Sequence, residues 1–196
     1  MKFTKIPDTA FDEIQLNAGV LSTTFTPSSG EIGDILAATS GGISFEATPT
    51  YTDFGEDIDN CPKNTKELKK LDSWEVKMSG SFVTVTATSA EMMVGAADTA
   101  KEATADKITP RNDVLDTDFG DIWLVGDYSS KNGDTNGGFV AIHMLNALST
   151  GGFKLQTADK NKGTLSFEFT GHYSIEGQST VPFEIYIKKG ADEAAE

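Results

Sequence analysis

Most of the chain alternates between apolar and polar residues, which is the pattern of β-strands with one buried face. Residues 43–51, ISFEATPTY, show it clearly, and residues 164–173 and 181–188 repeat it. Pro182 favours a strand start or a sheet edge for the last stretch. Its apolar face is predicted to consist of Val181, Phe183, Ile185 and Ile187. These stretches predict three strands, each with one face in a core.

Three other stretches predict less regular strands. In residues 73–87 the apolar positions change from even to odd numbers near Gly80, which predicts a bulge at that glycine. Residues 137–149 are apolar on both faces, which is typical of a strand covered on both sides, although periodicity leaves a helix over 139–148 open. Residues 121–128 predict a strand just before them.

One short helix is expected beside these strands, at residues 89–97. Thr88 and Glu91 have the spacing of a capping box, and apolar residues follow at helical spacing. The polar residues 99–113 after it predict a linker or exposed loop. The strands and the helix together predict a mainly β protein, a β-sandwich or partly closed barrel with one flanking α-helix.

The remaining segments are predicted to be loops or arms around a single domain of residues 1–190, because 196 residues suit one core. Residues 1–42 are expected to form an N-terminal arm and loops. Residues 129–138 are rich in Asn, Gly, Asp and Ser and predict a turn. The acidic residues 191–196 predict a flexible tail.

Residues 52–72 form the longest segment without a clear pattern, and loops of that length are usually functional or disordered. Acidic residues come first in it and lysines follow: Asp53, Glu56, Asp57, Asp59, Lys63, Lys66, Lys69 and Lys70. A loop with opposite charges at its two ends can meet another copy head to tail. A solvated loop with a lysine-rich helical turn remains the alternative.

The composition argues against several classes of function. The net charge is −14 and Arg111 is the single arginine, so specific binding to nucleic acid is not expected. Cys61 is the only cysteine, which rules out an internal disulfide and favours an origin in a reducing compartment. The first residues lack the apolar region of a secretory signal, and no stretch is long and apolar enough for a membrane span.

No set of residues predicts catalysis or metal binding. His143 and His172 each fall inside an expected strand, without a second strong ligand nearby in sequence. Asp116 with Asp118 is interpreted as a turn pair and Cys61 as a loop thiol. The sequence therefore predicts a protein that is not an enzyme and holds no cofactor.

Residues 40–98, from SGGISFEATPTYTDFGED to EMMVGAAD, and residues 120–175, from GDIWLVGDY to FTGHYSI, carry a resemblance to a known family. They resemble the major tail tube proteins of siphophages and of prophages of Gram-positive bacteria. With the opening and the last strand, the resemblance covers nearly the whole chain, although no single motif in it is diagnostic.

The resemblance implies six copies closing into a ring, with inner strands forming a continuous β-barrel, and rings stacking into the hollow tube through which DNA is ejected. It implies contacts with tail tape measure, tail terminator and distal tail proteins, and a place in the virion after synthesis in the host cytoplasm. Residues 52–72 would then contact the next ring. Glu46 and Glu168 are candidate lumen acids, since a negative lumen does not bind DNA; an outer-surface position is the alternative.

Two other functions remain open from the sequence. A tube of a contractile tail or a type VI secretion system shares the fold expected from the resemblance. An extracellular β-sandwich of a tail tip or adhesin, binding glycans or host surfaces, is the second. Glycan binding needs exposed aromatic rings, and Trp74 and Trp123 both lie in apolar strands that predict burial.

Overall fold

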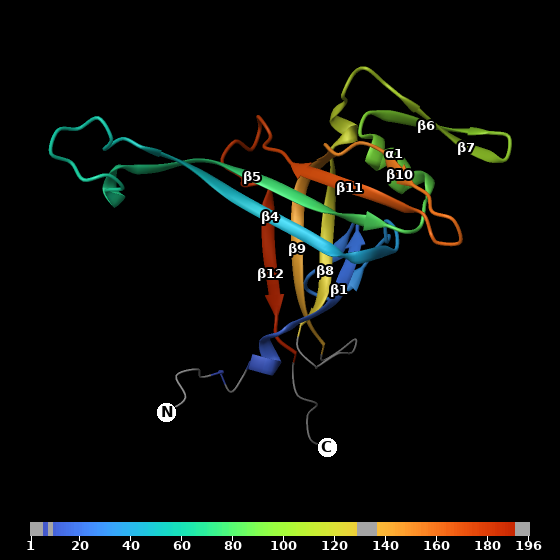
Figure 1. The fold of residues 1–196 in the computed structure, drawn as a ribbon, viewed down its shortest axis with the longest axis horizontal. Coiled ribbons are helices and arrows are strands. Elements are labelled where there is room, and N and C mark those ends of the chain that lie inside the picture. The colour runs from blue at the N-terminus through green and yellow to red at the C-terminus, as the bar shows by residue number, and fades with distance from the viewer. Residues whose placement is uncertain (1–5, 8–9, 129–136, 191–196) are drawn as a thin grey trace.

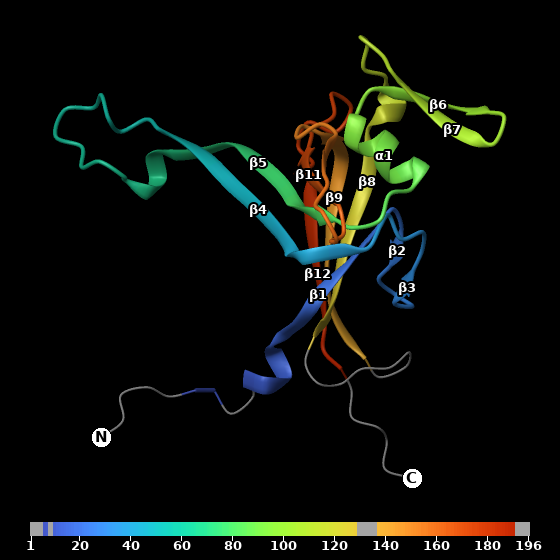
Figure 2. The ribbon, with the colours of Figure 1, turned by 45° about the vertical axis from the view of Figure 1, so that its right-hand side comes forward.

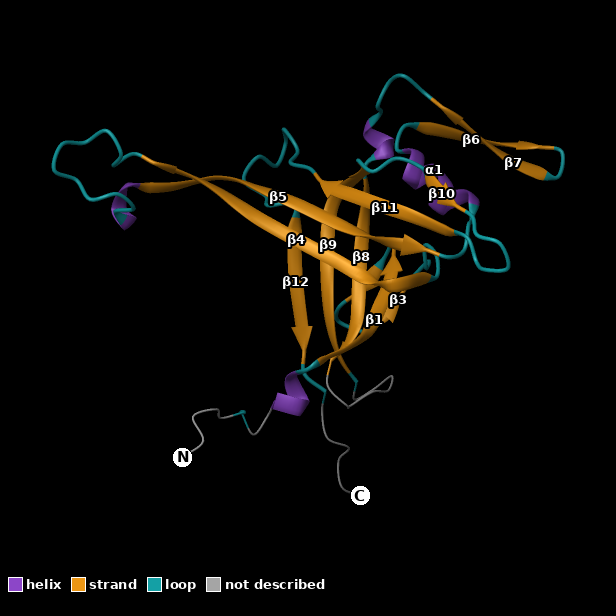
Figure 3. Cartoon of the chain, viewed as in Figure 1, coloured by secondary structure: helices purple, strands orange, loops and turns teal. Residues whose placement is uncertain are grey.

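A computed structural model describes residues 6–7, 10–128 and 137–190. It confirms a mainly β fold with two layers of antiparallel strands and one α-helix at their side (Figures 1 and 3). Most of the predicted turn at 129–138 and the predicted tail at 191–196 lie outside the described residues.

The first layer pairs its strands in the order β4, β5, β11, β10. Their bounds are Thr39–Asp53 for β4, Lys69–Phe82 for β5, Thr164–Gly171 for β11 and Lys154–Gln156 for β10. The second layer has the order β1, β8, β9, β12. Their bounds are Gln15–Ser22 for β1, Gly120–Tyr128 for β8, Gly138–Ser149 for β9 and Phe183–Lys188 for β12. The two layers cross at a large angle in Figure 2.

Shorter elements surround the layers. Two hairpins are formed by β2 with β3 and by β6 with β7; the strands are Phe25–Thr26, Glu31–Ile32, Ala97–Glu102 and Ala105–Pro110. The α-helix is α1, Ala87–Val94, and the 3-10 helices are η1 Ala10–Glu13, η2 Lys66–Leu68 and η3 Asp116–Asp118.

The main core fills the space between the two layers and α1. Its buried residues are Leu21, Leu36, Ala37, Val76, Met78, Phe82, Met93, Ile122, Met144, Ala147, Leu165, Phe167 and Phe169. The Phe82 and Phe167 rings stack with their centroids 4.2 Å apart. Burial of such aromatic and aliphatic side chains is the largest stabilising contribution to a domain of this size.

Strand β9 is covered on both faces, as its sequence predicted, and the alternative of a helix at 139–148 is wrong. Met144 and Ala147 belong to the main core, while Ala141 belongs to a second buried cluster on the opposite face. Phe25 of the β2–β3 hairpin covers that second cluster and packs against Trp123 of β8.

The predicted bulge at Gly80 is wrong, because β5 keeps its even-numbered residues inward as far as Phe82 and then ends. The irregularity lies in the neighbouring strand, where the pairing of β4 with β5 shifts between Thr39 and Ile43. Gly41 and Gly42 both have positive φ there, a conformation that glycine adopts without steric cost. The apolar residues from Val83 onward lead into the helix.

The helix begins earlier than predicted, and its cap is different. Thr86, in place of Thr88, accepts a hydrogen bond from the Ser89 backbone, and the Ser89 hydroxyl accepts one from the Thr86 backbone. The predicted loop at 99–113 is largely the β6–β7 hairpin. Arg111 fastens that hairpin to the body, with Nε 2.8 Å from Asp98 and a further ion pair to Asp118.

Two other predictions, on residues 15–22 and on the buried face of the last strand, were wrong because both features depend on tertiary contacts. Residues 15–22, which were assigned to the N-terminal arm and loops, form β1 against β8. In β12 the face with Ile185 and Ile187 is exposed, at 54% and 63%, whereas Tyr186 packs on the second cluster. The other layer leaves this half of β12 uncovered.

Replacing Phe169, which is 1% exposed in the main core, with alanine is expected to lower the free energy of unfolding by about 3–5 kcal/mol. Denaturant unfolding followed by circular dichroism measures the loss. Ile175→Ala is the control, because Ile175 is 88% exposed and its truncation should change stability by less than about 0.5 kcal/mol. Equal losses in the two variants would contradict the assignment of the core.

Candidate assembly surfaces

The outward side of β4, β5 and β11 forms a continuous polar face. The pairings of β4 with β5 and of β5 with β11 align its residues across the three strands. The polar face consists of Ser44, Glu46, Thr48, Thr50, Ser73, Glu75, Lys77, Ser79, Ser81, Thr164, Ser166, Glu168 and Thr170. It carries hydroxyls and carboxylates and a single lysine. Such a surface is hydrated and offers no aromatic or arginine side chain to a polyanion.

The two candidate lumen acids both lie on the polar face, near its one lysine. Glu46 is the cross-strand partner of Lys77. Glu168 of β11 lies opposite Ser79, two residues along β5 from Lys77. The Lys77 ammonium pairs with Glu75. That hydrogen bond to Glu75, together with attraction to Glu168 and Glu46, raises the pKa of Lys77. The acids outnumber the lysine, so the polar face is negative.

The polar face ends at an open edge of the sheet. Within the described residues, β4 pairs with β5 alone, so the other backbone edge of this 15-residue strand is free. At the opposite side, β10 is three residues long and pairs with β11 only. Long free strand edges pair readily with strands of other chains.

The predicted loop at 52–72 is the tip of a projecting β-hairpin, and both of its ends belong to the strands. Strands β4 and β5 stay paired as far as Asp53 and Lys69, so only residues 54–68 form the loop. Figure 1 shows the outer part of this hairpin extending away from both layers. Sequence periodicity missed these strand ends because both faces are solvent-exposed there and no alternation is needed.

The loop at the hairpin tip is held by Asp53. Its carboxylate accepts hydrogen bonds from the backbone N–H groups of Gly55 (2.9 Å) and Asn64 (2.8 Å). These two bonds, and weaker attraction to Lys69 and Lys63, lower the pKa of Asp53. Asp53 is predicted to be an inter-ring contact, and the structure shows it in this local role within the hairpin.

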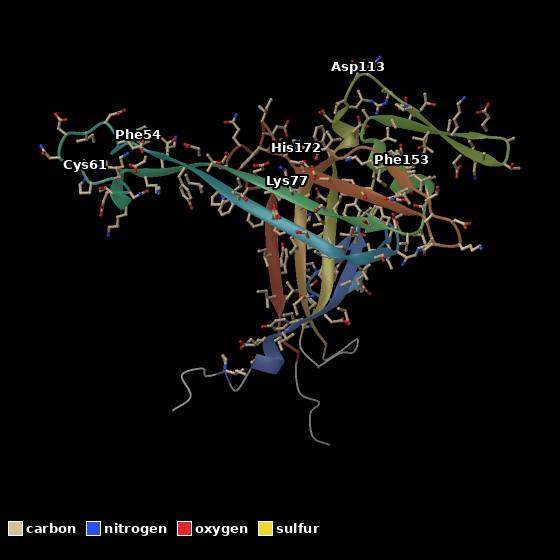
Figure 4. The ribbon with its side chains drawn as sticks, in the orientation of Figure 1. Phe54, Cys61, Lys77, Asp113, Phe153 and His172 are labelled. Carbon is tan, nitrogen blue, oxygen red and sulfur yellow. The ribbon has the colours of Figure 1, made fainter. Side chains whose placement is uncertain are left out.

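Three of the predicted lysines form ion pairs within the hairpin, Lys69 donates a hydrogen bond to Asn64, and Asp57 and Asp59 are exposed. Lys63 lies 3.9 Å from Glu56, Lys66 lies 3.4 Å from Glu67, and Lys70 lies 4.0 Å from Asp72. These exposed pairs contribute little to stability and can exchange partners. Tyr51 was expected on the buried face of the strand at 43–51 but is 50% exposed. Sequence periodicity did not single out Phe54, Ile58 and Leu71, whose exposed fractions are 58%, 50% and 43%. Figure 4 shows Phe54 at the hairpin's outer end.

An apolar groove of about 430 Å³ lies between β4 and the second layer. Its apolar lining comes from Ile43, Phe45, Leu124, Val140 and Ile142. Strand register continues this lining onto β12, because Ile142 faces Ile185 and Val140 faces Ile187. This exposed apolar groove is a candidate interaction site.

Three of the side chains considered above for catalysis or metal binding lie in a loop, at a turn and after a strand end. Cys61 is a free thiol in the hairpin loop, Asp118 pairs with Arg111 at a turn, and His172 follows the end of β11. Within the described ranges, no group of three or more His, Cys, Asp or Glu residues is arranged to hold a metal ion. No helix in that part of the chain is long and apolar enough to cross a membrane.

The tryptophans do not form an exposed aromatic surface. Trp123 is 7% exposed, and Trp74 packs against the main core with its ring 5.4 Å from that of Phe183. This agrees with the burial predicted from their strands. A glycan-binding groove built on tryptophan therefore has no support in this structure.

No model of a protein family matches this chain, and a search of curated proteins finds no match. The surfaces described above are therefore the basis for a functional proposal.

Replacing Asp53 with asparagine is expected to loosen the hairpin loop, because the ionised carboxylate holds two backbone amides. Amide exchange at Gly55 and Asn64 should become faster by a factor of a few, as for other surface groups. In the unchanged protein the pKa of Asp53 lies below its ordinary value of 3.8. The stabilisation is therefore present at neutral pH and is lost as the pH falls through that lowered pKa. Unchanged exchange in the variant would contradict this role.

Proposed function

We propose that this protein is the structural subunit of a bacteriophage tail tube, which assembles into stacked rings around a channel for DNA. The polar face is the observation that carries the proposal. In the first layer, one side packs apolar residues into the core, and the other side carries hydroxyls and carboxylates with Lys77 on β5 and Lys154 on the short β10. A negative, hydrated wall repels phosphate and lets a polyanion slide past.

The free edges of the first layer support closure into a ring. If the free edge of β4 in one copy pairs with the edge of the first layer at β10 in the next copy, the polar faces of successive copies form one inner wall. Closed barrels leave no exposed strand edge, so ring closure would also protect these chains from aggregation. A ring of six copies, the number implied by the family resemblance, fits a head-to-tail contact that closes on itself.

The projecting hairpin supports contact with a further copy. Its outer part extends away from both layers, yet its loop is ordered by Asp53 and presents Phe54 and Ile58 to solvent. An ordered, partly apolar projection loses little conformational entropy when it binds. We infer that the hairpin reaches the neighbouring ring. Its acidic residues and its lysines would then fix how the two rings are aligned.

In this proposal the protein belongs to the virion tail after synthesis in the host cytoplasm. Its partners are other copies of itself and the tape measure, terminator and distal tail proteins at the ends and centre of the tube. DNA passes through without specific binding, and no catalysis or cofactor is involved.

Negative-stain electron microscopy of the purified protein over a range of concentrations, with mass measured in solution, tests the proposal. Rings or hollow tubes are expected. Reversing Lys66, Lys69 and Lys70 to glutamate should leave rings intact and shorten the tubes. The control reverses Lys101 and Lys107 on the β6–β7 hairpin. A featureless monomer at every concentration would count against the proposal, and tubes of unchanged length would remove the role of the hairpin charges.

The double variant Glu46→Lys and Glu168→Lys tests the channel wall. It should still assemble, and its tubes should bind double-stranded DNA at low salt, with an affinity that falls steeply as salt rises. Co-sedimentation of labelled DNA with tubes measures the binding. The control, Glu102→Lys with Asp106→Lys, makes the same charge change on the β6–β7 hairpin. Equal DNA binding by both double variants would place the two glutamates outside the channel.

A further inference from the structure

Strand β12 is an edge strand of the second layer, and part of its apolar face is uncovered. Within the described residues it pairs with β9 alone, and Ile185 and Ile187 are largely exposed. Phe183 packs against Phe45 and Trp74 at its beginning. Beyond that point β12 keeps its backbone pairing with β9, and side chains on the face of Glu184 and Tyr186 add contacts with the sheet.

Those contacts centre on His143 of β9, which lies between two carboxylates. Its Nε2 is 3.0 Å from Asp121 Oδ2 of β8, and its Nδ1 is 3.6 Å from Glu184 Oε2 of β12. The imidazole stacks on the Trp123 ring with centroids 3.9 Å apart and planes within 7°. The side chain is 13% exposed. The ring therefore links three adjacent strands.

Each carboxylate also accepts a hydrogen bond from a second residue, and in Glu184 the accepting oxygen is Oε2, the one that faces the ring. Asp121 Oδ1 accepts a hydrogen bond from the Asn146 backbone, and Glu184 accepts one from the Tyr186 hydroxyl. The bond to Glu184 raises the pKa of Tyr186, so the hydroxyl stays a donor. Neither acid can supply a proton to the ring while it is ionised.

The number of protons on the ring decides how many of these contacts are favourable. A neutral imidazole has one N–H, and a second ring nitrogen with a lone pair. Nδ1 has no hydrogen-bond partner among the described residues. With Nε2 donating to Asp121, the Nδ1 lone pair faces the Glu184 carboxylate. An imidazolium instead donates from both nitrogens, and each bond joins opposite charges.

We propose that Asp121, His143 and Glu184 form a proton-dependent clasp that fixes the edge strand β12 to the sheet. The protonated ring ties β12 to β8 through β9. Loss of the proton turns the contact with Glu184 unfavourable and loosens β12, together with the exposed Ile185 and Ile187. The clasp acts within one chain, so its test does not depend on the proposed tube.

Hydrogen exchange of the β12 amides between roughly pH 5 and 8, corrected for intrinsic exchange rates, tests the clasp. The β11 amides serve as the internal reference, and the His143 ring is titrated by NMR in the same samples. Protection of β12 relative to β11 should fall about tenfold as the ring loses its proton, in line with one hydrogen bond to a charged group. A His143 ring that titrates without this fall, or that does not titrate in this range, would overturn the proposal.

Glu184→Gln provides the decisive variant, because it removes the negative charge that faces the Nδ1 lone pair. Protection of β12 in this variant should no longer depend on the state of the His143 ring. Glu46→Gln makes the same change in the other layer and should keep the full dependence. A pH dependence that persists in Glu184→Gln at the size seen in the unchanged protein would show that Glu184 takes no part.

Discussion

The sandwich depends on β9, the strand that both layers share. β9 pairs with β8 along its length, with β12 at its first half and with β11 at its end. Each such pairing satisfies backbone groups that would be costly to bury unpaired. Because β9 is covered on both faces, its side chains join the main core and the second cluster at once. A change in the position of β9 would therefore disturb both layers.

One pattern of alternation gives β4, β5 and β11 both stability and a candidate function. The inward residues include Met78, Phe167 and Phe169, which fill the core. The outward residues never need to be apolar, so they are free to form a hydrated and negative wall. A protein that conducts DNA needs such a wall, whereas a protein that binds DNA needs cations in it. The same sheet can thus support the fold and define the channel.

Several local interactions hold the peripheral elements in place. Arg111 fastens the β6–β7 hairpin through Asp98 and Asp118, and Asp53 orders the tip of the β4–β5 hairpin. These groups lie outside the main core, and each acts on a single projecting element. His143 makes a comparable tie for β12, but one that depends on a proton. The body can remain rigid while its edges respond to other chains or to pH.

The sequence by itself determined the regular strands, the short helix and the polar side of the sheet, including Glu46 and Glu168, because each depends on local alternation or spacing. Only the tertiary structure decided which face of β12 is covered, where the β4–β5 hairpin leaves the body, and that β1 pairs with β8. It also decided that His143 meets Asp121 and Glu184, from three different strands. Pairing between distant strands sets these features, and periodicity within one strand carries no information about its partners.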